Sequence, residues 1–264
     1  MKIAILVDGG YYRKRSASVL GHKDAKERAD ELYSYCNRHL KETSYGDEIR
    51  HDLYRIFYYD CPPIDKQVFN PVTKKNINFS KSDTKVWTED FFNALSHKRK
   101  VALRLGELNE DSVHYNLKAN VTKKLLNGSR DISDITEGDL ALQLQQKGVD
   151  MRIGLDIASL SYKHQVDKIV LIAGDSDFVP AAKLARREGI DFILDALGGH
   201  IRDSLSLHID GLRTCDNAFL PKLKLKKAPR SNFGQGEREA NSSIVKTCFL
   251  GGAFTIPILT ENEV

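Results

Sequence analysis

The sequence predicts an α/β, doubly wound fold in which helices flank a parallel sheet. Two short runs, residues 3–7 and 169–173, contain only apolar residues, which is typical of strands buried on both faces of such a sheet. Each run stops at a loop of Asp and Gly residues, and strand-like runs alternate with helical periodicity up to about residue 220. Sheets of this kind bind ligands outside the carboxyl ends of their strands.

Composition narrows the class of protein. Of 264 residues, 41% are hydrophobic and 29% charged, which suits a globular core and excludes a largely disordered or fibrous chain. The net charge of +4 is too small to identify a nucleic-acid partner by itself. The four cysteines are far apart, which argues against a zinc site and a disulfide framework. Without a membrane-length apolar run or a signal-peptide pattern, we expect a cytoplasmic protein with no membrane partner.

The first part of the chain predicts a βαβ unit. Residues 2–7 form its first strand, and residues 24–42 carry apolar side chains at helical spacing among charged ones. Residues 52–59 are rich in aromatic and aliphatic side chains and form the next strand, which stops before two prolines. Residues 64–82 are polar and rich in turn residues.

The middle of the chain is less regular. We expect a helix at residues 84–98 and a strand at residues 101–105. Residues 113–126 alternate too weakly to be assigned, and an Asn-Gly-Ser loop follows them. Residues 139–147 contain three leucines and are followed by a glycine, so we expect a short helix there.

The last part of the domain repeats the alternation. Asp150 is the expected N-cap of a buried helix at residues 151–160. A fully buried strand follows at residues 168–173. A proline in the first turn and a glycine after the last turn bracket a helix at residues 181–188, and a strand at residues 190–194 comes next.

The tail has a different character, so we expect a domain over residues 1–220 and a basic linker with a short extension over residues 221–264. The linker has five basic residues and no acidic one before a polar, glycine-containing stretch. Its apolar end at residues 247–259 suits packing on the core or on a partner, so a homo-oligomer or a protein partner through this tail stays open.

Acidic residues follow both buried strands. Asp8 ends the first strand, and Asp175 and Asp177 follow the later one, so a parallel sheet would bring them to the same edge. Asp150, at the start of a helix, could complete the group. Clustered carboxylates raise one another's pKa and repel, whereas a hard divalent cation with oxygen ligands compensates them. Mg²⁺ or Mn²⁺ is therefore the expected cofactor.

Three further residues are candidates beside these acids. Asp156 lies six residues after Asp150, about 240° around an ideal helix, so the two share a face only if Asp150 lies outside the regular turns. Ser176 could offer its hydroxyl to a phosphate, a water or a ligating carboxylate. Lys147 is the nearest basic residue in the sequence for a phosphate contact.

Four of the five acids also have an ordinary structural explanation. Asp8 suits a turn after a strand, Asp150 and Asp177 suit helix N-caps, and Asp156 suits a solvated helix face. The metal hypothesis therefore rests on the combination of these residues and not on any one of them.

That combination resembles a known family. The segments VDGGYYRK after the first strand, YYDCPP after the next, KGVDMRIGLDIASL, and VLIAGDSDFVPAAKLARREG are similar to those of NYN domains, specifically the LabA-like branch of the PIN-like nuclease superfamily. They cover about residues 1–215 in the expected order. KGVD together with GDSDF is more specific than either motif alone.

The resemblance implies a Rossmann-like PIN-type fold that hydrolyses phosphodiester bonds with Mg²⁺ or Mn²⁺, usually in RNA. By position, it implies catalytic and metal-binding roles for Asp8, Asp150, Asp175 and Asp177, with Asp156 as a further metal ligand. One departure is the sequence Gly9-Gly10-Tyr11-Tyr12, where many relatives have Asn shortly after the first Asp. Either a backbone group or a Tyr takes the supporting role, or activity is reduced.

Basic and aromatic residues are candidates for binding the substrate. Basic side chains around an acidic edge would hold a phosphate backbone, and aromatic rings such as those of Tyr12 and Trp87 could stack on unpaired bases. Charge runs are also typical of solvated faces, and aromatic residues of cores and turns. The substrate-binding candidates are Ser176, Lys147, Tyr11, Lys98, Arg99, Lys100, Arg186 and Arg187.

The sequence supports three hypotheses of different classes. The first is a metal-dependent nuclease acting on single-stranded nucleic acid, with RNA favoured over DNA. The second is a non-cleaving nucleic-acid-binding or scaffold protein with the same fold. The third, a receiver-like Mg²⁺ switch, ranks last because it needs paired acids after the first strand, and Asp8-Gly9-Gly10 supplies no pair.

Overall fold

A six-stranded parallel sheet forms the centre of the molecule. The computed structural model describes residues 1–44 and 47–220, so the expected basic linker and C-terminal extension lie outside the described residues. The strand order is β14-β13-β12-β1-β4-β7, and every neighbouring pair is parallel. This arrangement confirms the predicted α/β fold. The strands are β1 (Lys2–Asp8), β4 (Asp52–Asp60), β7 (Val101–Leu105), β12 (Lys168–Ile172), β13 (Asp191–Asp195) and β14 (Gly211–Leu212).

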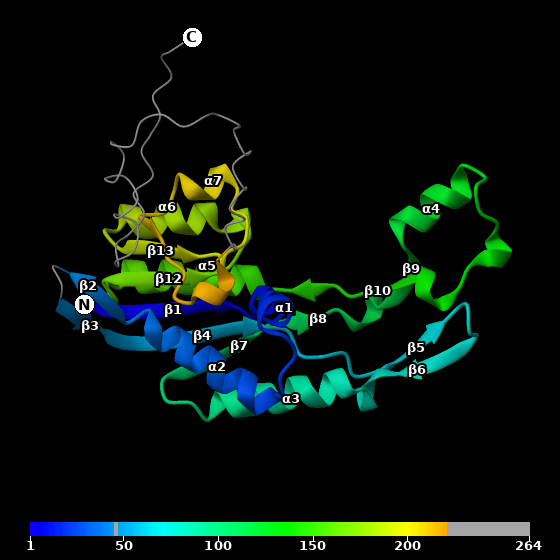
Figure 1. The fold of residues 1–264 in the computed structure, drawn as a ribbon, viewed down its shortest axis with the longest axis horizontal. Helices are drawn as coiled ribbons and strands as arrows, with labels where there is room; N and C mark the ends of the chain where they lie inside the picture. Colours follow the sequence, from blue (N-terminus) through cyan, green and yellow to red (C-terminus); the bar gives the residue numbers. More distant parts are fainter. Residues whose placement is uncertain (45–46, 221–264) are drawn as a thin grey trace, which may run out of the picture.

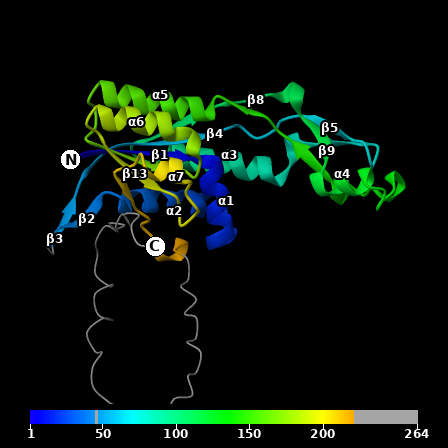
Figure 2. The ribbon, with the colours of Figure 1, turned by 90° about the horizontal axis from the view of Figure 1, so that it is seen from above.

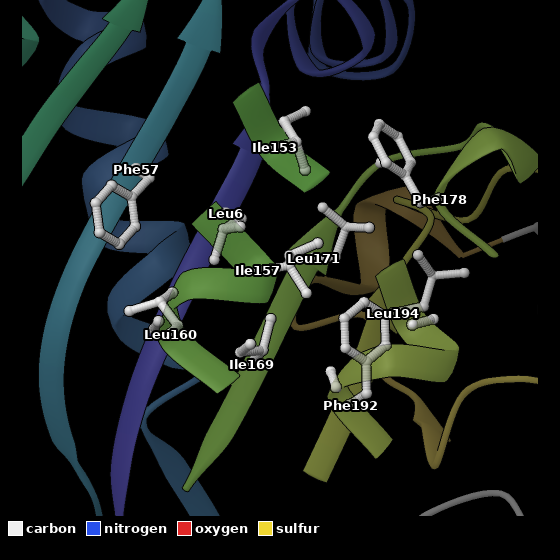
Figure 3. Close-up of a cluster of buried hydrophobic side chains, with 14 of the residues drawn as sticks. Leu6, Phe57, Ile153, Ile157, Leu160, Ile169, Leu171, Phe178, Phe192 and Leu194 are labelled. Atoms are coloured by element: carbon white, nitrogen blue, oxygen red, sulfur yellow. The ribbon is translucent and has the colours of Figure 1, made fainter. Parts of the chain in front are cut away.

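The two central strands are buried because both of their faces are apolar. The side chains from Ile3 to Val7 are fully buried, and β1 pairs with β12 on one side and β4 on the other. Successive residues of a strand point to opposite faces. Leu6 therefore packs with Leu171 and Ile157 in one core (Figure 3), whereas Ile5 belongs to the core on the other face.

Helices cover both faces of the sheet (Figures 1 and 2). The helices α5 (Val149–Tyr162) and α6 (Val179–Arg187) contribute to the first core, and α2 (Ala25–Arg38) and α3 (Asp83–Ser96) to the second. These four helices agree with the predicted helices at residues 24–42, 84–98, 151–160 and 181–188. A further helix, α1 (Gly9–Leu20), starts directly where β1 ends.

The sequence did not predict α1. Its first two residues are glycines, which disfavour helix, and its apolar side chains do not gather on one stripe. The helix forms because Asp8 caps it, accepting a hydrogen bond from the backbone N–H of Tyr11, and because Tyr12 is buried in the second core.

A slender projection extends from the sheet beyond the carboxyl ends of β4 and β7 (Figure 1). It is built from antiparallel strand pairs and one helix, α4 (Ala119–Leu126), around a small apolar cluster of Ile64, Val68 and Val113. The pairs are β5 (Gln67–Asn70) with β6 (Lys75–Asn78), β8 (Glu107–Leu108) with β11 (Gln146–Lys147), and β9 (His114–Leu117) with β10 (Leu140–Gln143).

Two predictions for residues 139–150 were wrong. Residues 140–143 and 146–147 form strands β10 and β11 in place of an α-helix, because Leu140 and Leu142 recur at the period of two and are half-buried on one face of a strand. Asp150 is not an N-cap. Gly148, in the left-handed conformation at φ 79°, occupies that position and places Asp150 in the first turn of α5.

The remaining elements are short. A hairpin of β2 (Lys41–Ser44) and β3 (Asp47–Arg50) lies beside the amino ends of the sheet, and α7 (Asp203–Ser206) follows β13. Short 3₁₀ turns cover Phe79–Lys81, Glu110–Ser112, Ile132–Asp134, Glu137–Asp139, Ser176–Phe178 and Asn217–Phe219. Among the helices that the structure describes, none combines the length and the apolar character needed to cross a membrane.

Candidate functional site

Asp8 lies where β1 meets α1, at the carboxyl edge of the sheet. Its Oδ1 atom accepts the backbone N–H of Tyr11 at 3.0 Å, which fixes the carboxylate at the start of the helix. The next residue, Gly9, has no room for a side chain, because a Cβ atom there would lie 2.5 Å from the ring of Tyr58 and 2.6 Å from Oδ2 of Asp60. The absence of a side chain at Gly9 therefore allows the end of β1 to lie close to the end of β4.

Asp60 ends β4 beside Asp8 and is a site residue that sequence reasoning missed. Its carboxylate is 1% exposed and accepts hydrogen bonds from Arg13 Nη2 at 2.8 Å, Tyr58 Oη at 2.9 Å and the N–H of Cys61 at 2.8 Å. The available signal was its position directly after an apolar strand, the same signal that identified Asp8. The Arg13 guanidinium neutralises this buried carboxylate.

The other predicted acids lie on two neighbouring elements. Asp150 projects from the first turn of α5, and Asp175 and Asp177 belong to the turn that follows β12. Oδ1 of Asp175 accepts the backbone N–H of Asp177 at 3.1 Å, so Asp175 also caps this turn. Both Asp175 and Asp177 are exposed.

The charges of these acids influence one another. The pKa of Asp8 is raised to about 6, first by burial and then by the carboxylates of Asp150 and Asp60, against the lowering effect of the Tyr11 N–H. Desolvation raises the pKa of Asp150, and so do the negative charges of Asp175 and Asp177. Within residues 1–44 and 47–220, no Lys, Arg or His forms an ion pair with Asp8, Asp150, Asp175 or Asp177. The edge is therefore an uncompensated group of carboxylates.

Carboxylate oxygens are the donors that Mg²⁺ and Mn²⁺ prefer, so the chemistry of this edge fits a hard divalent cation. The mutual elevation of pKa is the cost that such a cation would relieve. In the part of the chain that the structure describes, no three His, Cys, Asp or Glu side chains are already gathered as a ready metal-binding group. The type of the donor atoms and their place at one edge of the sheet are therefore what fit such a cation.

Tyr11 and Ser176 both lie at the acidic edge. The Tyr11 hydroxyl donates to the carbonyl of Ala196, and its ring fills the space beside Gly174 and Gly199, where Cβ atoms would lie 2.3 and 2.4 Å from Tyr11 atoms. This ring therefore joins the loops after β12 and β13. Ser176 Oγ accepts a hydrogen bond from Arg202 Nη1 at 3.2 Å, which adds an exposed cation that the sequence analysis did not select.

Asp156 has its partners outside the group of Asp8 and Asp150. Asp156 accepts hydrogen bonds from Tyr59 Oη at 2.8 Å and Arg104 Nε at 3.1 Å, so its charge is already paired. Lys147 is exposed in β11, at the base of the projection and three residues before Asp150.

A family model for the NYN domain matches residues 2–206. The chain belongs to the NYN domain family. This family is part of the PIN-like nuclease superfamily, so the class of activity that it supports is nuclease activity. The prediction of the family from the motifs is confirmed, and the nucleic-acid substrate class follows from the family.

Other comparisons add little to the NYN assignment. No curated protein matches the chain. A crystal structure of a protein of unknown function from Vibrio parahaemolyticus is similar at 15% sequence identity with a TM-score of 0.39, over 83% of this chain and 96% of that one. The fold assignment therefore rests on the sheet topology described above.

The basic residues expected around the acidic edge of the NYN domain lie at the opposite edge. Lys98 and Lys100 precede β7, where Lys98 pairs with Asp30 and Lys100 donates to the carbonyl of Leu53. Arg186 occupies the last turn of α6, about 10 Å along the axis from its first turn, and pairs with Asp210 at 2.7 Å. Arg99 lies between Lys98 and Lys100, and Arg187 follows Arg186, so both also lie at the amino edge.

Proposed function

We propose that this NYN domain is a metal-dependent ribonuclease that hydrolyses phosphodiester bonds in single-stranded RNA. The observation that carries the proposal is the group of unpaired carboxylates at the carboxyl edge, where burial and neighbouring acids raise the pKa of Asp8 to about 6. A protein that used these residues only as turns or caps would have no need to bring Asp8 close to Asp60 and Asp150.

The proposed roles follow from the positions of the side chains. Asp8, Asp150, Asp175 and Asp177 would hold one or two Mg²⁺ or Mn²⁺ ions and act as the catalytic acids. A bound ion of this kind lowers the pKa of an attacking water and neutralises charge on the phosphodiester. The N-terminal backbone of α1 would position the Asp8 carboxylate through the N–H of Tyr11. Asp156 is left out of this set because Arg104 and Tyr59 already occupy it.

Substrate contacts are proposed for the residues at the carboxyl edge. Arg202 bonds Ser176 beside Asp175, and Lys147 lies near Asp150, so both offer positive charge to a phosphate backbone that crosses the acids. We also propose, from the sequence motifs and composition, that the domain belongs to the LabA-like branch, that the protein is cytoplasmic and that it assembles through the C-terminal segment.

The test is cleavage of end-labelled single-stranded RNA and DNA by purified protein during titration with Mg²⁺ and Mn²⁺. We expect cleavage of RNA that disappears with chelator. Asp8→Asn and Asp175→Asn keep side-chain volume and capping ability but are poor ligands for a hard cation, so each should lose cleavage by orders of magnitude and lose stabilisation by Mn²⁺. Asp90→Asn, an exposed change in α3 at a carboxylate with no ion pair among the described residues, serves as the matched control.

Wild-type cleavage by both Asp8→Asn and Asp175→Asn, in preparations free of contaminating nuclease, would refute the mechanism. Tight binding of RNA without cleavage at any metal concentration would instead support the second hypothesis, a non-cleaving binding module.

A further inference from the structure

A cavity of about 410 Å³ lies between α1 and α3, beside the buried Asp60. Its size is within the range of ordinary small-molecule sites, about 300–1,000 Å³. The segment that follows α1 closes it, and the indole N–H of Trp87 in α3 donates to the carbonyl of Lys23 in that segment at 3.0 Å. The lining includes Arg13, His22, Lys23, Arg28, Trp87 and Thr88.

The lining is rich in cationic donors. It holds the three permanent cations Arg13, Lys23 and Arg28 against one carboxylate, Asp83. Lys23 and Arg28 also pair with Glu31, behind the lining, and Arg13 pairs with Asp60. The Nε atom of Arg13 is buried and has no hydrogen-bond partner among the residues that the structure describes. This atom is closed to a ligand, but an arginine can donate five hydrogen bonds and the Arg13 side chain is 27% exposed, so donors other than the one on Asp60 are left for an anionic ligand.

The same cavity contains a fixed aromatic ring. Trp87 stacks on Phe91 with ring centroids 5.1 Å apart and an interplanar angle of 9°, and its N–H is held by Lys23. The ring is therefore oriented before any ligand arrives. Asp83 and Thr84 at the start of α3 also line the cavity, and the Asp83 carboxylate already supplies the negative charge that the N-terminus of this helix favours.

We propose that this cavity binds a nucleoside monophosphate unit, with its phosphate at Arg13 and Lys23 and its base against Trp87. A flat base and a phosphate together match an aromatic ring beside cationic donors better than either group does alone. The unit could be a free mononucleotide or one nucleotide of a strand. Binding of a nucleotide within a strand rests on the proposed nuclease function, whereas binding of a free mononucleotide does not.

Arg13 connects the cavity to the acidic edge. This residue lines the cavity and pairs with Asp60, and Asp60 is near enough to Asp8 to raise its pKa. A strand with one nucleotide in the cavity would therefore continue toward Asp8.

The chain has one tryptophan, so intrinsic fluorescence reports on this cavity directly. Titrations in EDTA with the four ribonucleoside 5′-monophosphates should give a saturable change in Trp87 emission. Parallel titrations with a 5′-phosphorylated 2′-O-methyl tetranucleotide distinguish the two sources. Tighter binding of the tetranucleotide assigns the cavity to the strand path, and equal binding assigns it to free nucleotides. Nucleosides and inorganic phosphate alone should bind at least about tenfold more weakly, since each lacks one half of the contacts.

The double variant His22→Gln/Lys23→Gln should weaken nucleotide binding by at least about tenfold, because it removes the Lys23 charge and the His22 ring from the lining. Lys14→Gln, an exposed change in α1 outside the cavity, should bind like wild type. Trp87→Phe, followed by equilibrium dialysis, should weaken binding without depending on fluorescence. Asp8→Asn should bind nucleotides normally, which separates this inference from the proposed catalysis.

Two results would overturn the inference. One is the lack of any saturable signal with both the mononucleotides and the tetranucleotide. The other is equal affinity of the double variant and Lys14→Gln, with both shown to be folded by circular dichroism.

Discussion

At the scale of single residues, Asp8 imposes a pH-dependent cost on folding. Its pKa rises from 3.8 to about 6 on folding, so between pH 4 and 6 the folded state binds more protons than the unfolded state. The stability of the metal-free protein should therefore fall as the pH rises through this window and stay lower above pH 6. The full effect is at most about 3 kcal/mol.

Asp8→Asn removes this cost, since an amide does not ionise. In EDTA we expect the variant to be more stable than wild type at pH 7.5 and to match it near pH 4. Urea unfolding at the two pH values measures the difference, with Asp90→Asn as the control. A constant difference between Asp8→Asn and wild type at both pH values would show that burial of the charge is not the cause.

Gly9 and Gly10 offer a matched pair at the same edge. A Cβ atom at Gly9 would lie 2.5 Å from Tyr58, which is fully buried, whereas at Gly10 the nearest atom, Oδ1 of Asp8, is 3.5 Å away. Gly9→Ala should therefore lose about 1–3 kcal/mol of stability through overpacking, while Gly10→Ala should be neutral or better because Ala favours helix. Thermal unfolding compares them, and equal melting temperatures would contradict this account.

The sequence was enough to predict the place of a residue that directly follows a strand. Asp8 and Asp175 follow apolar strands, and parallel strands place such residues at one edge. Asp60 shares this position, but what makes it important is its buried pairing with Arg13, 47 residues away, and nothing in the local sequence signals that pairing. Contacts between side chains from different elements could not be predicted in this way.

At the scale of elements, the side chains of β10 alternate between packed and exposed positions. Leu142 packs against the small core of the projection, whereas its neighbour Ala141 is exposed, as the strand period requires. Leu142→Asp should therefore open the projection, and Ala141→Asp should have little effect. Hydrogen exchange of the β9 and β10 amides is the measurement. Equal protection in the two variants would show that Leu142 contributes no packing.

The length of β10 also explains why a helix was wrongly predicted at residues 139–147. Helices and strands of the core are long enough for their periods to be distinguished, so α2, α3, β4 and β12 were predicted near their observed bounds. Strands β10 and β11 have four and two residues, and over such lengths three leucines at alternate positions fit either period. Their partners, β9 and β8, are what decide the structure.

At the scale of the whole molecule, the positions of the basic residues predict the salt dependence of RNA binding. Arg202 and Lys147 lie at the carboxyl edge, and Arg99 and Arg187 at the amino edge. Neutralising the first pair to Gln should weaken binding of single-stranded RNA and reduce the slope of log affinity against log salt by up to about 0.7 for each lost phosphate contact. Neutralising the second pair should change neither.

Filter binding at several salt concentrations compares the two double variants, with Asp8→Asn as background to prevent cleavage. A slope that falls only for the Arg99 and Arg187 pair would place the RNA on the opposite edge of the sheet.

The pairing of β1 with β12 has a consequence for how the chain is made. The two strands are neighbours in the sheet, yet about 160 residues separate them in the sequence. At about 5–20 residues per second, a ribosome needs roughly 8–30 seconds to proceed from one to the other. During that time one edge of β1, whose side chains are apolar on both faces, has no partner from its own sheet. The nascent chain therefore has its greatest exposure to aggregation and to chaperones before residue 172 has emerged.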